Sequence, residues 1–185
     1  MQNLRCWAEI DLAALERNLN RIRSALPAGI KYISVVKADA YGHGIHPTAA
    51  RLMQTGVDLF AVANVKEAMD IREMGTGWPI LILGPLLCEE DQAILEYNLI
   101  PSLSNEDELN RFVQLGQKRG SPLPVHLKID TGMGRMGCWW EHAPILLQKV
   151  LQAPEIELQG VLTHFPVPHD RNFTEDQRDK FLSVI

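Results

Sequence analysis

Residues 35–44 read Val35-Val36-Lys37-Ala38-Asp39-Ala40-Tyr41-Gly42-His43-Gly44, and the chain is organised around them. The preceding run, residues 30–34, is β-branched and aromatic and predicts a buried strand, while the two glycines precede a helical pattern. Lys37 is therefore expected at the C-terminal end of a strand. An ammonium that leaves an apolar strand is partly desolvated, which favours the neutral, nucleophilic amine that Schiff-base chemistry requires. For an isolated lysine, the alternative is a side chain that reaches solvent past a turn.

The composition is that of a soluble globular protein. The chain has 185 residues, of which 46% are hydrophobic and 22% charged. A net charge of -5 without any Lys/Arg-rich run argues against a nucleic-acid-binding surface. Apolar runs such as residues 80–83 are too short to span a bilayer, and residues 1–5 show no signal-peptide pattern. We therefore expect a cytoplasmic protein with no nucleic-acid or membrane partner.

The cysteine and histidine spacings predict neither disulfides nor a metal site. Cys6, Cys88 and Cys138 are odd in number, lie far apart and form no C-x-x-C motif, which indicates reduced thiols in a reducing compartment. His43 and His46 have the spacing of a metal-binding pair, but no carboxylate or cysteine cluster completes a ligand set. We expect no metal.

Strand and helix signals alternate along the whole chain. A short strand is predicted at Arg5–Ile10, and Asp11 caps a helix whose leucines repeat with helical spacing. Further strands are predicted at residues 58–62, 79–83, 99–103, 124–130 and 156–163. Helices are predicted at residues 47–56, 64–75, 89–97, 104–119, 141–152 and from Thr174, with capping boxes at Asn64–Glu67 and Thr174–Gln177.

This alternation predicts the fold class. Strands joined to helices by short connections imply parallel strands with right-handed crossovers, hence an α/β sheet or barrel. A complete eight-unit barrel takes about 250 residues, whereas about six βα units follow the first helix here. We therefore predict one partial domain, residues 1–185, that forms an incomplete (β/α)8 TIM-type barrel. The chain is expected to stop at Ile185 within an amphipathic helix, as if cut.

A second motif covers residues 125–137. Strict alternation places His126, Lys128 and Asp130 on one face of a strand, which in a barrel points inward, where an unpaired ammonium is costly. The following Thr131–Gly137 segment has three glycines that allow close backbone approach to a ligand, and it brings Arg135 to the rim. From the residues alone, an ordinary Lys128–Asp130 ion pair and a surface Arg135 remain open.

A third candidate is His164, which ends the strand at Val161–Phe165 at the same kind of rim position. Lone histidines are more often structural, as we expect for His43, His46, His142 and His169. The interpretation of His164 therefore depends on its neighbours.

Residues 35–44 and 128–137 closely resemble the alanine racemases. Thr163-His164-Phe165 and the Trp7-x-Glu9-Ile10-Asp11 opening extend the resemblance over nearly the whole chain. It implies a pyridoxal-phosphate-dependent barrel followed by a C-terminal β domain, which is absent from these residues. It also implies interconversion of L-alanine and D-alanine, a supply of D-alanine for peptidoglycan, and a homodimer at full length.

The resemblance assigns a role to each candidate residue. Lys37 holds pyridoxal 5'-phosphate covalently and serves as a catalytic base, and Tyr41 hydrogen-bonds the cofactor's phosphate. Arg135 contacts the cofactor's phenolic oxygen and the substrate carboxylate, and Met133 belongs to the pocket wall. Lys128 is carbamylated and pairs with Arg135. His164 packs against the pyridine ring.

The chain departs from the family pattern at two points. Pro166-Val167-Pro168-His169-Asp170 replaces the small residues and acidic pair that usually follow Thr-His-Phe, and two prolines stiffen that loop. The family's second base is a tyrosine of the partner subunit's β domain, and no residue in 1–185 matches it. We therefore expect these residues alone not to racemise. Alternatives are another racemase or a decarboxylase of this fold, a non-enzymatic single-domain pyridoxal-phosphate-binding protein, or a structural remnant.

Overall fold

The computed structural model describes residues 5–185, which form two compact units. The boundary between the units lies between Ile80 and Leu81 in the sequence. In both units strands alternate with helices along the chain, as predicted. The strand pairs are parallel, which is the arrangement that helical crossovers require.

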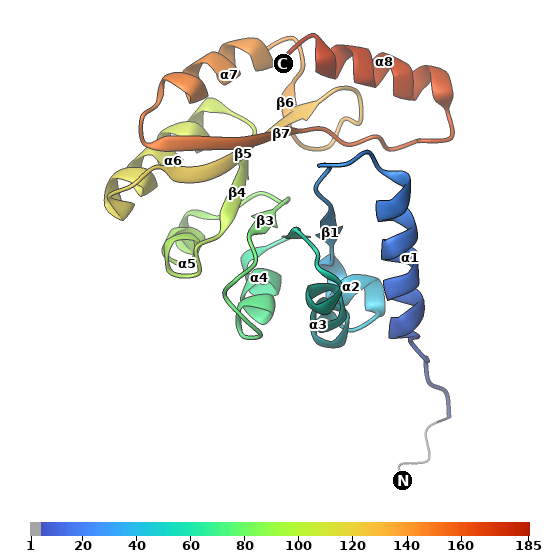
Figure 1. Ribbon diagram of the computed structural model, residues 1–185. Coiled ribbons are helices and arrows are strands. Elements are labelled where there is room, and N and C mark those ends of the chain that lie inside the picture. The colour runs from blue at the N-terminus through green and yellow to red at the C-terminus, as the bar shows by residue number, and fades with distance from the viewer. Residues whose placement is uncertain (1–4) are drawn as a thin grey trace. The chain divides into compact units, whose positions relative to one another are not determined.

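The first unit contains the segment around Lys37 (Figure 1). Its elements are α1 (Leu12–Ala25), β1 (Ile33–Val35), α2 (Lys37–Gly42), α3 (Ile45–Thr55), β2 (Leu59–Val62) and α4 (Val65–Arg72). Strand β1 pairs with β2 in parallel, with Ser34 opposite Phe60. Asp11 caps α1 by accepting a hydrogen bond from the Ala14 amide at 2.9 Å, as predicted.

The second unit carries the longer strands. Its elements are β3 (Ile80–Ile82), the 3-10 turn η1 (Cys88–Glu90), α5 (Asp91–Glu96), β4 (Ile100–Leu103), α6 (Glu106–Arg119), β5 (Leu123–Asp130), β6 (Cys138–Trp139), α7 (Ala143–Gln152), β7 (Ile156–Leu162) and α8 (Arg171–Leu182). Strand β4 pairs with β3 and β5, and β5 pairs with β7 and with the short β6, which the sequence does not predict. Helix α6 packs on β5 and α7 on β7 (Figure 1).

Both units have apolar cores between strands and helices. Strand β5 buries Val125, Leu127 and Ile129 almost completely, and α6 contributes Phe112. In the first unit Phe60 on β2 is fully buried. Each such side chain contributes about 1.5–3 kcal/mol of burial free energy. The near-continuous apolar strands are typical of parallel sheets covered by helices.

Two predictions near the N-terminus are wrong. Arg5–Ile10 forms no strand, because an extended segment becomes a strand only when it pairs with the edge of another strand. The side chains of this segment are exposed. Strand β1 is shorter than expected and not buried throughout. Only Ser34 is buried, whereas Ile33 and Val35 are each 39% exposed.

The prediction for the last helix is also wrong at both ends. Asp170 caps α8, accepting from the Phe173 amide at 3.0 Å, so the helix begins three residues before Thr174. The Thr174 hydroxyl instead donates to the Val167 carbonyl within the proline-containing loop. The helix ends at Leu182 rather than continuing to Ile185. An earlier and equally strong cap residue thus outcompeted the predicted capping box.

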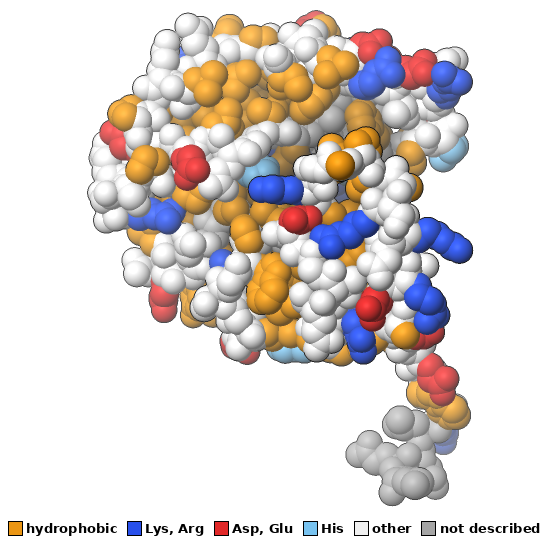
Figure 2. Space-filling model, viewed as in Figure 1, with side chains coloured by type: hydrophobic (Ala, Val, Ile, Leu, Met, Phe, Trp, Pro, Cys, Tyr) orange, Lys and Arg blue, Asp and Glu red, His pale blue; other side chains and the backbone are white. Residues whose placement is uncertain are grey.

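The surface shows no gathering of one charge on the visible face. In Figure 2, Lys and Arg side chains are interspersed with Asp and Glu. None of the helices within residues 5–185 is both long and apolar enough for a transmembrane span. Cys6, Cys88 and Cys138 form no disulfide within residues 5–185.

Candidate active site

Lys37 lies two residues beyond β1 and opens α2, a segment of unusual backbone conformation. Residues 38–41 all adopt left-handed angles, with φ between 53° and 56°. For residues other than glycine this conformation costs roughly 1–2 kcal/mol each, and it persists only where the surroundings enforce it. The half-buried Lys37 side chain therefore precedes a strained left-handed turn, which we define as Ala38–Tyr41.

Two carboxylates hold this left-handed turn. Glu67 on α4 accepts from the Ala38 amide at 2.8 Å through Oε1 and from the Ala63 amide at 2.8 Å through Oε2. At the other end, Asp39 Oδ1 accepts from the Ile45 amide at 2.6 Å, where α3 begins. The predicted capping box at α4 is therefore only half present. Asn64 does cap the helix, but the Glu67 carboxylate binds other amides.

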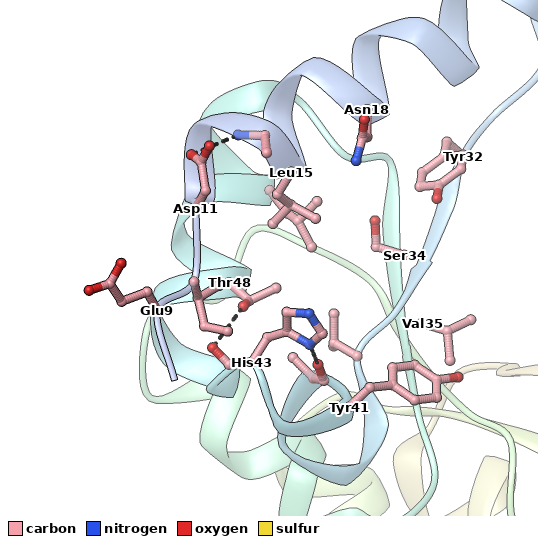
Figure 3. A pocket seen from close by; sticks show the side chains of 15 residues that line it. Glu9, Asp11, Leu15, Asn18, Tyr32, Ser34, Val35, Tyr41, His43 and Thr48 are labelled. Carbon is pink, nitrogen blue, oxygen red and sulfur yellow. Dashed lines mark hydrogen bonds between the residues drawn. The ribbon is translucent and has the colours of Figure 1, made fainter. Parts of the chain in front are cut away.

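Tyr41 is 60% exposed and borders a cavity of about 530 Å³ in the first unit. Figure 3 shows Ser34 and Tyr32 on the strand side of this cavity and Leu15 on the helix side, while the Tyr41 ring extends away from them. Within residues 5–185 the buried Ser34 hydroxyl has no hydrogen-bond partner. Because the Tyr41 side chain is exposed, its phenol remains available on the exposed side of the turn.

In the second unit, the polar face of β5 is buried. Lys128 is 5% exposed, and its Nζ donates to the Leu83 carbonyl at 3.1 Å. Burial lowers the pKa of His126 below its ordinary value of 6.5, because desolvation penalises the charged imidazolium. A neighbouring strand approaches closely here, since a Cβ on Gly160 would lie 2.6 Å from the His126 ring.

The glycine-rich loop, residues 131–137, folds around one carboxylate. Asp130 accepts from the backbone amides of Gly132 at 2.9 Å, Gly134 at 2.9 Å and Arg135 at 3.2 Å. The Asp130 carboxylate thus fixes the loop through these backbone amides. The loop also needs Gly137, because a Cβ there would lie 2.6 Å from the Asp130 amide nitrogen.

The structure brings Lys128 and Arg135 to one cavity of about 340 Å³. Its other polar walls come from Ser102, Asn105 and Glu108. Met136 lines this cavity, whereas Met133, which is half-buried, does not. A buried ammonium and an exposed guanidinium sharing one cavity make it suitable for an anionic ligand or an anionic modification.

His164 follows β7 by two residues and is exposed. The preceding Thr163 hydroxyl lies 2.8 Å from the Thr131 hydroxyl, and Lys128 pairs with Leu162 in the β5–β7 register. The segment ending in His164 therefore lies beside the start of the glycine-rich loop. The roles of Met133 and His164 remain predictions.

Two residues that organise the site were not recognised from the sequence. Asp130 had a usable signal, because an Asp followed by glycines at the second and fourth positions is typical of a side chain that caps its own turn. Glu67 had only its capping-box signal, which indicates a helix start and not a contact across the chain. Within residues 5–185, no group of three or more His, Cys, Asp and Glu side chains is arranged to hold a metal ion.

Candidate functional side chains at the carboxyl ends of parallel strands, with helices between the strands, are typical of the barrel-type α/β proteins. The family model described as the N-terminal domain of alanine racemase matches residues 10–185, and the chain belongs to this family. An alanine racemase of Halothermothrix orenii is 39% identical over 181 residues, which are 97% of this chain and 48% of that protein. The chain thus spans about half the length of the curated relatives it matches.

Solved structures agree with this assignment. The alanine racemase of Clostridium difficile 630 in complex with cycloserine has a TM-score of 0.93 and 30% identity, over 100% of this chain and 51% of that one. The predicted fold class, an incomplete (β/α)8 barrel, is confirmed. A histidine racemase of Leuconostoc mesenteroides has a TM-score of 0.83 and 25% identity, over 94% of this chain and 47% of that one. The same fold thus occurs in a racemase named for another amino acid.

Proposed function

We propose that this chain is the cofactor-binding part of a pyridoxal-phosphate-dependent racemase that interconverts L-alanine and D-alanine. The observation that carries the proposal is the placement of Lys37 at the end of β1, before a left-handed turn held at both ends. Membership of the alanine racemase family supports it. A fixed, half-buried primary amine at a strand end is suited to a covalent carbonyl cofactor.

The donor set fits pyridoxal 5'-phosphate. Lys37 offers the amine that binds an aldehyde, and the exposed Tyr41 phenol offers a hydrogen bond to a phosphate. Arg135 offers a guanidinium for the phenolic oxygen. The carboxylates of Glu67 and Asp39 accept hydrogen bonds from backbone amides, so both are already engaged within this chain. When bound, the cofactor acts as an electron sink for the amino acid's Cα.

The residues of this chain would then have separate roles in proton transfer, substrate binding and cofactor binding. Lys37 moves a proton at Cα on one face, and Arg135 orients the substrate carboxylate through its planar fork. Carbamylation of the buried Lys128 would turn a cation into an anion that can pair with Arg135. His164 would pack against the pyridine ring, and Met133 would form part of the pocket wall outside the cavity that Lys128 and Arg135 share.

The remaining parts of the proposal concern the whole protein. A second base on the opposite face of Cα comes from the partner subunit of a homodimer. The product D-alanine serves peptidoglycan synthesis in the cytoplasm. We expect residues 1–185 alone to bind the cofactor without racemising alanine, because no residue among them matches the second base.

The test is to incubate the chain with pyridoxal 5'-phosphate, reduce with borohydride and map the modified lysine by peptide mass spectrometry. We expect the label on Lys37, its loss in Lys37→Ala and its retention in Lys66→Ala, which removes an exposed lysine of the same unit. Labelling spread over exposed lysines, unchanged by Lys37→Ala, would contradict the proposal. Racemisation is assayed separately on the same sample.

Substrate identity is a second question, raised by the histidine racemase with the same fold. A complete protein that racemises histidine and not alanine would replace the alanine assignment while keeping the role of Lys37. Parallel assays with both amino acids decide between them.

A further inference from the structure

We infer that Glu67 is a positioning residue for Lys37, an inference that rests on the proposed role of Lys37. Its carboxylate holds the left-handed turn in the conformation that presents the Lys37 amine. Within residues 5–185, no hydrogen bond or ion pair joins Glu67 to the Lys37 amine. It acts through the backbone amide of Ala38, the residue directly after Lys37.

The two hydrogen bonds of Glu67 bridge the ends of two parallel strands. The last backbone bond between these strand ends runs from the Val36 amide to the Ala61 carbonyl at 2.9 Å. Beyond it the chains diverge into the left-handed turn and into α4. There the carboxylate accepts from Ala38 on one side and Ala63 on the other, both at 2.8 Å. A single side chain thus continues the pairing where the backbone ladder stops.

A helix-capping role does not account for this geometry. A capping-box glutamate accepts from the amide of the N-cap residue, here Asn64. Glu67 instead accepts from Ala63 and from Ala38, which lies 29 residues away in sequence. Asn64 already caps α4 by accepting from the Glu67 amide at 3.0 Å. Helix α4 therefore has its cap without the Glu67 carboxylate, which is left to hold the other segment.

The left-handed turn needs such a restraint at its first residue. Alanine in the left-handed region has a lower-energy right-handed alternative, so Ala38 stays there only while its surroundings favour it. Asp39 fixes the end of the segment towards α3. Glu67 fixes the end towards Lys37. Without the carboxylate, Ala38 can relax, and rotation of its peptide redirects the Lys37 side chain.

The experiment compares the full chain with Glu67→Ala, Glu67→Gln and the control Asn64→Ala. The control weakens the start of the same helix without touching the Ala38 amide. Initial rates of borohydride-trapped labelling of Lys37 by pyridoxal 5'-phosphate are measured beside thermal unfolding. We expect Glu67→Ala to label Lys37 roughly tenfold more slowly, because small misplacements of a reacting group have large rate effects. Glu67→Gln should fall between, since its single oxygen serves one amide. Asn64→Ala should label at the wild-type rate despite a lower Tm.

Hydrogen exchange at the Ala38 amide gives a second readout, independent of the cofactor. We expect protection in the wild type and in Asn64→Ala, and loss of protection in Glu67→Ala. Equal Lys37 labelling and equal Ala38 protection in Glu67→Ala and Asn64→Ala would overturn the inference and leave the proposed function intact. A wild-type chain that does not label at Lys37 would overturn the proposed function, whereas the exchange data would still decide whether Glu67 holds the left-handed turn.

Discussion

The Lys37 segment and the Arg135 segment both place a basic side chain just after a parallel strand, but they do so by different means. The residues after Lys37, Ala38–Tyr41, are not glycines and adopt a strained left-handed conformation. The carboxylate of Glu67, which is distant in sequence, holds this conformation through the Ala38 amide. The Arg135 segment uses glycines in positive-φ conformations, folded around Asp130 at its own base.

The two segments show two ways in which a loop after a strand can be made rigid. A turn of residues with side chains resists bending once formed, but it depends on a contact that lies far away in sequence. A glycine-rich loop adopts its shape with little strain, yet glycine gives it no stiffness, so local hydrogen bonds have to supply it. The first arrangement suits the covalent role proposed for Lys37, and the second suits the proposed role of Arg135 in binding exchanging ligands.

The largest effect is expected from Gly137→Ala. Its Cβ would lie 2.6 Å from the Asp130 amide nitrogen and 2.8 Å from the Ile129 carbonyl carbon, at a φ of +127°. These are backbone atoms of β5 and cannot move aside, so we expect a loss of about 3 kcal/mol in the free energy of unfolding, measured with denaturant.

Gly134→Ala is the matched control within the same loop. Its φ is +71°, but among residues 5–185 no heavy atom beyond its own and those of its chain neighbours lies within 4 Å of the position that a Cβ would take there. Only the left-handed strain remains, and we expect a loss of about 1 kcal/mol. Equal losses at both glycines would mean that close backbone packing does not shape this loop.

The next effect concerns the two aspartates. In the wild type, the two carboxylate oxygens of Asp130 accept from the backbone amides of three residues. Asp130→Asn leaves only one accepting oxygen, so we expect a loss of about 2 kcal/mol in the free energy of unfolding. Asp39→Asn keeps the single oxygen that accepts from the Ile45 amide at the start of α3, and we expect a loss below about 0.5 kcal/mol. Denaturant unfolding of both variants measures the contrast. A larger loss of stability in Asp39→Asn than in Asp130→Asn would contradict the view that the Arg135 segment depends more on its own local carboxylate.

The same contrast explains what the sequence could predict. The strand at residues 124–130 and the helix at 104–119 were found within two residues of their bounds, because their periodicity and cap signals are local. The candidate basic residues came from motifs that lie within single segments. The cap of α8 at Asp170 was missed because two competing cap signals lie four residues apart, and only packing selects one.

Other features that escaped prediction depend on partners elsewhere in the chain. Ala38–Tyr41 carries little local signal for the left-handed turn, since only Asp39 among these residues is of a type enriched at positive φ, and the contact from Glu67 is not visible in the sequence. The short strand β6 exists because Cys138 meets Ile129 after the glycine loop has folded back. The predicted strand at Arg5–Ile10 failed for the converse reason, because its local pattern found no partner edge.

A smaller effect of opposite sign is expected within the left-handed turn. Ala38→Gly removes the penalty of φ +53° while keeping the amide that binds Glu67, so we expect a gain of about 0.5 kcal/mol in stability. Ala50→Gly, in the right-handed helix α3, should lose about 1 kcal/mol. Thermal unfolding compares the two. Losses of equal size would show that Ala38 is not strained.

The smallest effect is the pH dependence that His126 contributes to the second unit. Burial lowers its pKa below 6.5 in the folded chain, so between the folded and unfolded values the unfolded state binds more protons. Stability supplied by the neutral imidazole is present above about pH 6.5 and is lost as the pH falls through that window. We expect His126→Gln to flatten the fall in unfolding free energy between pH 7 and 5, measured by urea titration. An unchanged slope would mean that the imidazole is solvated, and that the polar face of β5 is less enclosed than its contact with Gly160 indicates.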